Sequence, residues 1–155
     1  MATPEEKLAE LGLTLPEVVP PLAAYQPAVR NGELVFTAGQ LPAKDGQMLA
    51  TGKLGAEVSE EDGYACARQC ALNALAAVKA EIGELSQVKR VVKAVVFVAS
   101  TPDFTAQPQV ANGASELLGE VFGEAGKHAR SAVGVASLPL DVPVEVELVV
   151  ELVES

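Results

Sequence analysis

The sequence has little positive charge, and this shortage limits the partners that the chain can bind. It contains 11 Lys and Arg residues against 21 Asp and Glu residues, which gives a formal net charge of −10, and its basic residues form no cluster. Nucleic acids are bound through their phosphates by basic surfaces, so binding to RNA or DNA is not expected. Only a basic pocket formed on assembly would escape this argument.

Long apolar runs are also lacking. No uninterrupted apolar stretch reaches the roughly 18 residues that a membrane-spanning helix needs. Residues 1–10 are charged and lack the apolar core of a secretory signal. We therefore expect a cytoplasmic protein without a membrane partner. With 155 residues, 49% of them hydrophobic, the chain is long enough for one domain with its own core.

Cysteine and histidine are scarce, which restricts the chemistry further. Cys66 and Cys70 lie four residues apart in a predicted helix, where the geometry rarely allows a disulfide. A metal site would need more ligands than the chain offers, so we expect both thiols to be buried and no metal to be bound. His128 is the only histidine and has no Gly-x-Ser-x-Gly partner, so a Ser-His-Asp triad is not supported. A gating role beside Arg130 remains open for it.

The N-terminal half carries one strong turn signal. Asn31-Gly32 predicts a β-hairpin between strands at 28–29 and 34–36, because a tight primed turn needs positive φ at both central positions. The other elements expected in this half are a short helix at 5–12, an extended connector at 16–21 and a loop at 43–57.

The middle of the chain alternates helix and strand. Ser59 predicts the start of a helix that ends near Ile82 at Gly83. The apolar segment 89–99 predicts a strand, and its richness in valine indicates burial on both faces. A second helix follows, with one apolar stripe at helical spacing formed by Val110, Ala114, Leu117, Leu118 and Val121.

Residues 128–147 form the most informative segment. They predict two alternating strands joined by a Leu-Pro-Leu-Asp turn, with Arg130 near the start of the first and Glu145 early in the second. If these strands pair as a hairpin, a guanidinium and a carboxylate approach the same end of a sheet. That arrangement suits a small anionic substrate together with a water to be activated. Alternation in the second strand places Glu145, Glu147 and Val149 on the face opposite Val144, Val146 and Leu148.

The order of elements, β-β-α-β-α-β-β, predicts an α+β fold: one mixed sheet with two helices packed on one face. No internal repeat or linker is visible. We expect a single domain at 1–155, with an N-terminal extension at 1–22 and a core at 23–153. The second face of the sheet keeps many apolar residues, and assembly into a ring would cover it.

Three motifs together resemble one protein family. The first is His128-Ala-Arg-Ser, followed by apolar residues, Leu-Pro and an acidic strand. The second is Tyr25-Gln-Pro-Ala-Val with the later Gly39-Gln-Leu-Pro. The third is the strand Val91–Val98, followed by Asp103-Phe104. Over roughly residues 25–150 the chain resembles the reactive-intermediate deaminase family, also called Rid or YjgF-like and named in part endoribonuclease L-PSP.

The resemblance implies a fold similar to the trimeric kind of chorismate mutase. The homotrimer would enclose a central barrel formed by its sheets, with three sites in the clefts between subunits. The implied activity is hydrolytic deamination of small 2-imino or 2-enamino acids to 2-keto acids and ammonia. This reaction requires neither a metal nor an organic cofactor.

The resemblance also implies roles for individual residues. Arg130 would hold the substrate carboxylate and Glu145 would orient the attacking water. Tyr25 would line the cleft, and the backbone at Gly39 and Ala132 would approach the ligand. Each residue also has a plainer interpretation: Arg130 in a surface ion pair, Glu145 solvated, Tyr25 a packed ring and Gly39 an ordinary glycine at a strand end.

The chain departs from the family pattern at several positions. Ala132 stands where many members have cysteine, and Pro108 stands where many have asparagine, with Asn112 a candidate replacement. The segment between Phe104 and Arg130 is longer than in short members, and because it borders the expected cleft we expect it to influence substrate preference. Two rival functions stay open: a module that binds a 2-keto acid without turnover, and an endoribonuclease. The acidic charge and the absence of a histidine pair argue against the latter.

Overall fold

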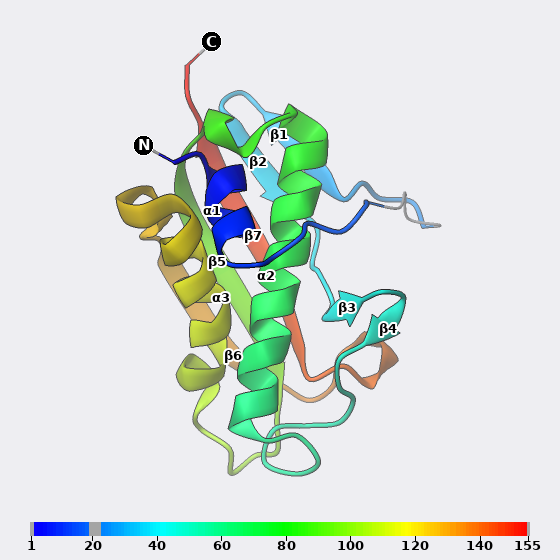
Figure 1. The fold of residues 1–155 in the computed structure, drawn as a ribbon. Helices are drawn as coiled ribbons and strands as arrows, with labels where there is room; N and C mark the ends of the chain where they lie inside the picture. The colour runs from blue at the N-terminus through cyan, green and yellow to red at the C-terminus, as the bar shows by residue number, and fades with distance from the viewer. Residues whose placement is uncertain (1, 19–22, 155) are drawn as a thin grey trace.

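The computed structural model describes residues 2–18 and 23–154; parts of the expected N-terminal extension and connector, at 1 and 19–22, lie outside them. Five strands form one mixed sheet in the order β1-β2-β7-β5-β6. Helices α2 (Glu60–Ile82) and α3 (Gln107–Phe122) cover one face of it (Figure 1). The strands are β1 (Ala28–Asn31), β2 (Leu34–Thr37), β5 (Val88–Ala99), β6 (Ala129–Val135) and β7 (Val144–Leu152). The predicted α+β fold and element order are confirmed.

Smaller elements complete the chain. Helix α1 (Pro4–Glu10) matches the predicted N-terminal helix. The segment predicted as a loop at 43–57 contains a short hairpin, β3 (Ala43–Lys44) with β4 (Gln47–Met48), which turns through Asp45 and Gly46 with positive φ. Three 3₁₀ turns are η1 (Leu85–Gln87), η2 (Gly123–Gly126) and η3 (Pro139–Asp141).

Helix α2 begins and ends where the sequence predicts. The Ser59 hydroxyl accepts a hydrogen bond from the backbone N–H of Asp62, and Gly83 closes the helix with a φ of 96°. The helix packs closely on α3, because a Cβ at Gly113 would overlap the carbonyl of Tyr64. Small residues on the facing sides therefore allow two helices to share one side of the sheet.

The two cysteines lie inside this packed layer. Cys66 and Cys70 are buried and free, as predicted. Burial raises the pKa of the Cys66 thiol to about 11, and burial likewise raises that of Cys70. Both therefore remain protonated and serve as small apolar side chains.

The predicted hairpin between the last two strands is wrong. Strand β5 lies between them, pairing parallel with β6 and antiparallel with β7. The reason is the helix before β6: β5, α3 and β6 form a β-α-β unit, whose crossover makes β6 parallel to β5. Strand β7 then takes the other side of β5 and also pairs with β2.

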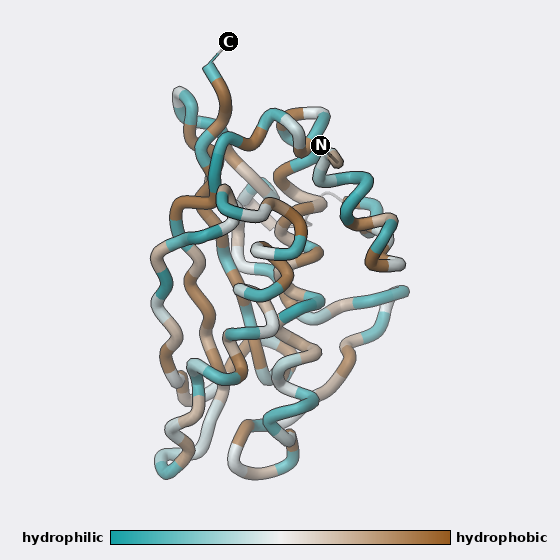
Figure 2. The backbone as a smooth tube through the Cα atoms, turned by 60° about the vertical axis from the view of Figure 1, so that its left-hand side comes forward, coloured by the Kyte–Doolittle hydropathy of each residue, from teal (hydrophilic) through white to brown (hydrophobic). Residues whose placement is uncertain are grey.

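The prediction that β5 is buried on both faces is also wrong for the single chain. Val91, Ala94, Val96 and Val98 are buried under the helices, whereas Lys93, Val95 and Phe97 on the opposite face are only partly covered. Hydrophobic stretches run along the strands as well as the helices (Figure 2). We call the sheet face away from α2 and α3 the open face.

The open face exposes large apolar side chains. Val29 is 52% exposed, Phe36 43% and Val133 45%. Val29 pairs with Phe36 across β1 and β2, and Phe36 pairs with Val149 across β2 and β7, so an apolar band crosses three strands. This band is a candidate surface for contact with another subunit. Within residues 2–18 and 23–154, no helix has the length and apolarity needed to cross a membrane.

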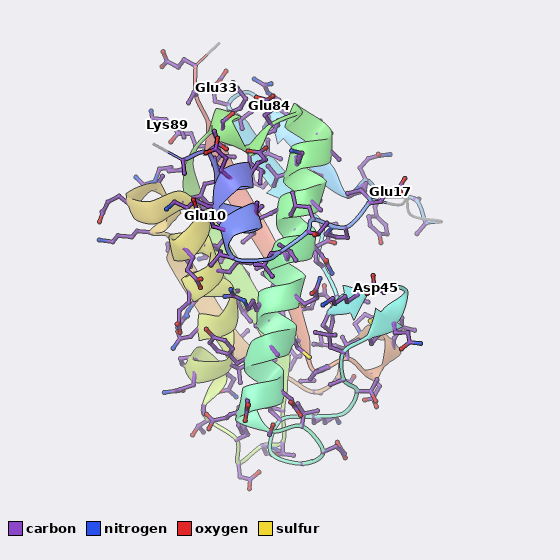
Figure 3. All side chains as sticks on the ribbon, in the orientation of Figure 1. Glu10, Glu17, Glu33, Asp45, Glu84 and Lys89 are labelled. Carbon is purple, nitrogen blue, oxygen red and sulfur yellow. The ribbon has the colours of Figure 1, made fainter. Side chains whose placement is uncertain are left out.

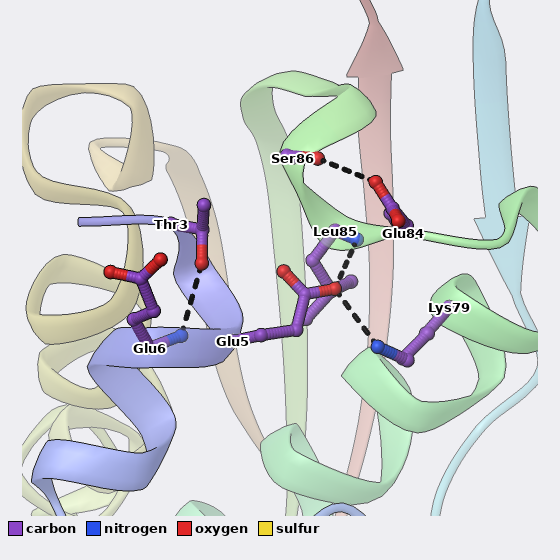
Figure 4. A network of polar contacts seen from close by, with 7 residues as sticks. All are labelled: Thr3, Glu5, Glu6, Lys79, Glu84, Leu85 and Ser86. Carbon is purple, nitrogen blue, oxygen red and sulfur yellow. Dashed lines mark hydrogen bonds and ion pairs between the residues drawn. The ribbon is translucent and has the colours of Figure 1, made fainter. Parts of the chain in front are cut away.

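The N-terminal helix contacts the rest of the fold through the carboxylate of Glu5 and the buried side chain of Leu8. Glu5 accepts hydrogen bonds from the backbone N–H of Leu85, at 2.8 Å, and from Lys79 Nζ, at 2.9 Å (Figure 4). Burial raises the pKa of Glu5, but these bonds together lower it below its ordinary value. Leu8 of the same helix is 3% exposed. Helix α1 is therefore docked on the core through both packing and charge.

Candidate functional site

The structure divides the predicted site residues into two groups. Arg130 and Ala132 lie on β6, level with Ala94 and Val96 of β5, and face the helix side of the sheet. Glu145 pairs with Phe97 and lies on the open face of β7, where the predicted alternation is confirmed. Arg130 and Glu145 therefore lie on different strands and opposite faces, with β5 between them.

Arg130 is held by α3. Its Nη1 donates to Asn112 Oδ1 at 2.8 Å and to Ser115 Oγ at 3.1 Å. These two residues are three apart on the helix and so share one face. Arg130 forms no ion pair with any described carboxylate, so its surface ion-pair interpretation is not supported. A half-buried guanidinium held only by neutral oxygens keeps its charge available for an anion.

Of the two side chains that hydrogen-bond to Arg130, the sequence identifies only Asn112. Asn112 was a candidate for the amide displaced at Pro108, and it does contact Arg130. Pro108 itself lies in the first turn of α3, where proline is tolerated. Ser115 was not identified, although its spacing from Asn112 on a predicted helix was a usable signal. His128 joins the group through Ser115.

Glu145 is crowded by the backbone. Gly39 lies so close that a Cβ there would overlap the Glu145 carboxylate. Backbone hydrogen bonds between Gln40 and Val146, at 2.8 and 3.0 Å, fix the segment after β2 beside β7. The absence of a side chain at Gly39 thus leaves room for the Glu145 carboxylate in this position.

The same crowding changes the acidity of Glu145. Burial raises the pKa of this carboxyl, and repulsion from Glu147, on the same face of β7, raises it further. A carboxylate that binds a proton more readily than usual is suited to accept one from water and pass it on. Perturbed acids of this type concentrate at functional sites.

A cavity of about 420 Å³ opens beside Gly39. Tyr25, 55% exposed, stands at it, together with Leu41, Met48 and Ala77. Its ionisable carboxyl groups are Glu17 and Asp45, which lie on the side of the molecule where β3 and β4 are found (Figure 3). Gly39 borders both this cavity and the Glu145 carboxylate, and Tyr25 lines the cavity, whereas Glu145 itself is not among the lining residues.

Comparison with known proteins extends over nearly the whole chain. Residues 5–152 match the family described as "YjgF/chorismate mutase-like, putative endoribonuclease". Protein TCP17 of Trypanosoma cruzi is 49% identical over 146 residues, which cover 94% of this chain and 91% of TCP17.

Solved structures give the same result. The Agrobacterium tumefaciens protein Atu1372, of unknown function, has a TM-score of 0.90 and 44% identity, with 97% of this chain and 92% of that one covered. Escherichia coli TdcF with bound serine has a TM-score of 0.63 and 28% identity, covering 85% of this chain and 91% of TdcF. The family match, the sheet order and the relatives agree, and the chain belongs to the YjgF/chorismate mutase-like family.

Proposed function

We propose that this protein hydrolyses small 2-imino or 2-enamino acids to 2-keto acids and ammonia. The observation that carries the proposal is the Arg130 guanidinium, fixed by two neutral side chains and free of any described carboxylate. A planar two-pronged donor in this state suits a substrate carboxylate. TdcF, a relative solved with bound serine, shows that a member of this fold accommodates an amino acid.

The chemistry follows from the two groups. Arg130 holds the substrate carboxylate. A water adds its oxygen to the electrophilic C=N carbon, and Glu145 accepts a proton from that water. That proton passes to the nitrogen and gives a tetrahedral carbinolamine. Glu145 then takes the proton of the new hydroxyl and delivers it to the nitrogen, the C–N bond breaks, and ammonia leaves behind a C=O group. Imines hydrolyse unaided, so positioning and electrostatics are sufficient for acceleration and no metal or cofactor is needed.

The separation of the two groups favours a site shared between subunits. One chain holds Arg130 and Ala132 on the helix side of edge strand β6, and holds Tyr25, Gly39 and Glu145 elsewhere. A heterologous contact that closes into a ring would bring one group of each chain to the other group of its neighbour. The exposed apolar band on the open face supplies the surface for such assembly, and we propose a homotrimer.

Ammonia release from freshly generated 2-iminopropionate, with and without protein, tests the activity. A subunit-mixing experiment tests the shared site. Equal amounts of the Arg130→Ala and Glu145→Gln variants are unfolded together and refolded, so that rings containing both kinds of subunit form. Each variant alone is nearly inactive, but about one quarter of the sites in random rings would pair an intact arginine with an intact glutamate. Recovery to that level supports a shared site. No recovery, or a mass near 16.0 kDa by light scattering, contradicts it.

The rival binding-module function makes a different prediction. The Arg130 group alone would bind a 2-keto acid, so a wild-type protein that binds pyruvate without accelerating imine hydrolysis favours that function. The family description also includes endoribonuclease. Salt-dependent RNA binding and cleavage would be required for it, and the formal charge of −10 argues against them.

A further inference from the structure

We infer that Ser115 and His128 are positioning residues that fix Arg130 so that its Nε–Nη2 edge is presented to the substrate carboxylate. This inference rests on the proposed function and adds the hydrogen-bond network that orients Arg130. Neither residue contacts the substrate in this scheme; both act through the guanidinium.

The direction of each hydrogen bond can be assigned. His128 Nδ1 lies 2.6 Å from the carbonyl oxygen of Gly126, and a carbonyl only accepts, so Nδ1 carries the proton. In the neutral ring Nε2 is then an acceptor. It lies 2.9 Å from Ser115 Oγ, so the serine hydroxyl donates to it. The serine oxygen is left to accept from Arg130 Nη1.

The chain of bonds begins at a fixed backbone atom. Gly126 sits against α3 so closely that a Cβ there would overlap the carbonyl of Leu118. The acceptor for His128 is therefore set by the packing of η2 on α3. His128 fixes the direction of the Ser115 hydroxyl, and Ser115 fixes the plane of Arg130.

Both N–H groups of Arg130 Nη1 donate hydrogen bonds, one to Asn112 Oδ1 and one to Ser115 Oγ. Nε and Nη2 make no hydrogen bond with any residue that the structure describes. These two nitrogens carry the parallel N–H pair on the side of the guanidinium, which matches the two oxygens of a carboxylate. Holding Nη1 thus selects which edge of the arginine meets the ligand.

The test uses matched variants of the full-length protein. Ser115→Ala should raise KM for 2-iminopropionate, and the Kd of pyruvate, on the order of fivefold with kcat nearly unchanged, as expected for loss of ground-state and transition-state binding alike. His128→Asn keeps a donor for Gly126 but loses the acceptor for Ser115, so it should behave similarly. His128→Gln places an amide oxygen where Nε2 was and should restore most of the affinity.

A double-mutant cycle separates positioning from structure. In an Arg130→Ala background, Ser115→Ala should have no further effect on pyruvate binding, because Ser115 acts only through the arginine. Ser137→Ala, in the exposed loop after β6, is the control and should change neither KM nor Kd. Melting temperatures identify any variant that is merely unfolded.

The outcomes distinguish this inference from the proposed function. If the wild type turns over and Ser115→Ala and His128→Asn leave KM and Kd within twofold, the positioning role is wrong and the function stands. If the wild type binds pyruvate without turnover and Ser115→Ala weakens that binding, the positioning role stands and deamination is wrong. A wild type that neither binds pyruvate nor turns over contradicts both.

Discussion

The two halves of the candidate site are held by opposite means. Arg130 on β6 is held by hydrogen bonds to two neutral side chains of α3, which leave its positive charge without a carboxylate partner among the described residues. Glu145 on β7 is confined by direct contact with the Gly39 backbone and by a like charge at Glu147. The cation is stabilised in one orientation, whereas the carboxyl is made easier to protonate. The neutral partners thus leave the charge of Arg130 unpaired, whereas burial and the nearby Glu147 raise the pKa of Glu145.

The largest effect is expected at the arginine. Arg130→Ala should remove essentially all acceleration of imine hydrolysis while leaving the melting temperature nearly unchanged. Arg130→Lys keeps the charge but loses the two-pronged donor, at a cost on the order of 1.5–3 kcal/mol in carboxylate recognition. Steady-state kinetics and thermal melts provide both measurements. Full activity in Arg130→Ala would exclude the assigned role, and unfolding would make Arg130 structural.

Glu145→Gln should lower kcat on the order of 10²–10⁴-fold and leave pyruvate binding intact, because the carboxyl handles water rather than the ligand carboxylate. The raised pKa also fixes the sign of its effect on stability. A raised pKa means that the folded protein favours the protonated carboxyl, so the charged form is a cost above the folded pKa. At pH 7 the Glu145→Gln variant should therefore unfold at a urea concentration no lower than that of the wild type. A clear loss of stability at pH 7 would contradict the burial argument.

Gly39→Ala tests the crowding itself. The new Cβ would overlap the Glu145 carboxylate, so the carboxylate or the segment after β2 must move. Because the overlapped atoms are the end of a flexible side chain, we expect at most about 1 kcal/mol of destabilisation and a fall in kcat larger than any change in pyruvate affinity. Gly119→Ala is the matched control, since it lies in α3 with open space around it and should stabilise the helix by about 0.5–1 kcal/mol. Equal behaviour of the two variants would remove the argument for Gly39.

The smallest effect is expected at Glu5, a carboxylate whose pKa is shifted the other way from that of Glu145. Glu5→Gln weakens the tie to Lys79 and Leu85 and should lower the free energy of unfolding by about 1 kcal/mol at pH 7. Because the folded pKa is lowered, this contribution is present above the unfolded pKa and is lost as pH falls below the ordinary value of 4.5. Urea titrations at pH 7 and pH 3 check it, with Glu6→Gln in the same helical turn as control. A difference that persists at pH 3 would assign the effect to packing.

Local signals in the sequence were sufficient for most elements. The cap at Ser59 and the stripe on α3 each depend on neighbours within one or two turns of chain, and both appear as predicted. The hairpin predicted at Asn31-Gly32 also forms, but the predicted turn is wrong by one residue: Asn31 still pairs with Leu34, the central residues are Gly32 and Glu33, and Gly32 is the one with positive φ. The pairing of the last two strands failed because sequence proximity favoured a hairpin, whereas the strand order depends on the handedness of the crossover through α3. No pattern within residues 128–147 records that constraint.

The candidate site was predictable in its residues but not in its arrangement. The alternation of β7 correctly placed Glu145 opposite Val144 and Val146. The helix-side position of Arg130 required the register of β6 on β5, which places it level with Ala94. The contact of Gly39 with Glu145 depends on a bridge between Gln40 and Val146, more than a hundred residues apart in the chain. Long-range register of this kind has no local signal.

The position of β5 between β6 and β7 has a consequence for how this protein can change. The offset between Arg130 and Glu145 is measured along β5, from Ala94 to Phe97, and not by the length of the turn at Pro139–Asp141 that joins their strands. Residues can be added to that turn without altering the offset. A single residue inserted in β6 before Arg130 would instead turn its side chain to the other face of the sheet. In this fold, the register of β6 and β7 on β5 sets the offset, and the length of the turn at Pro139–Asp141 does not.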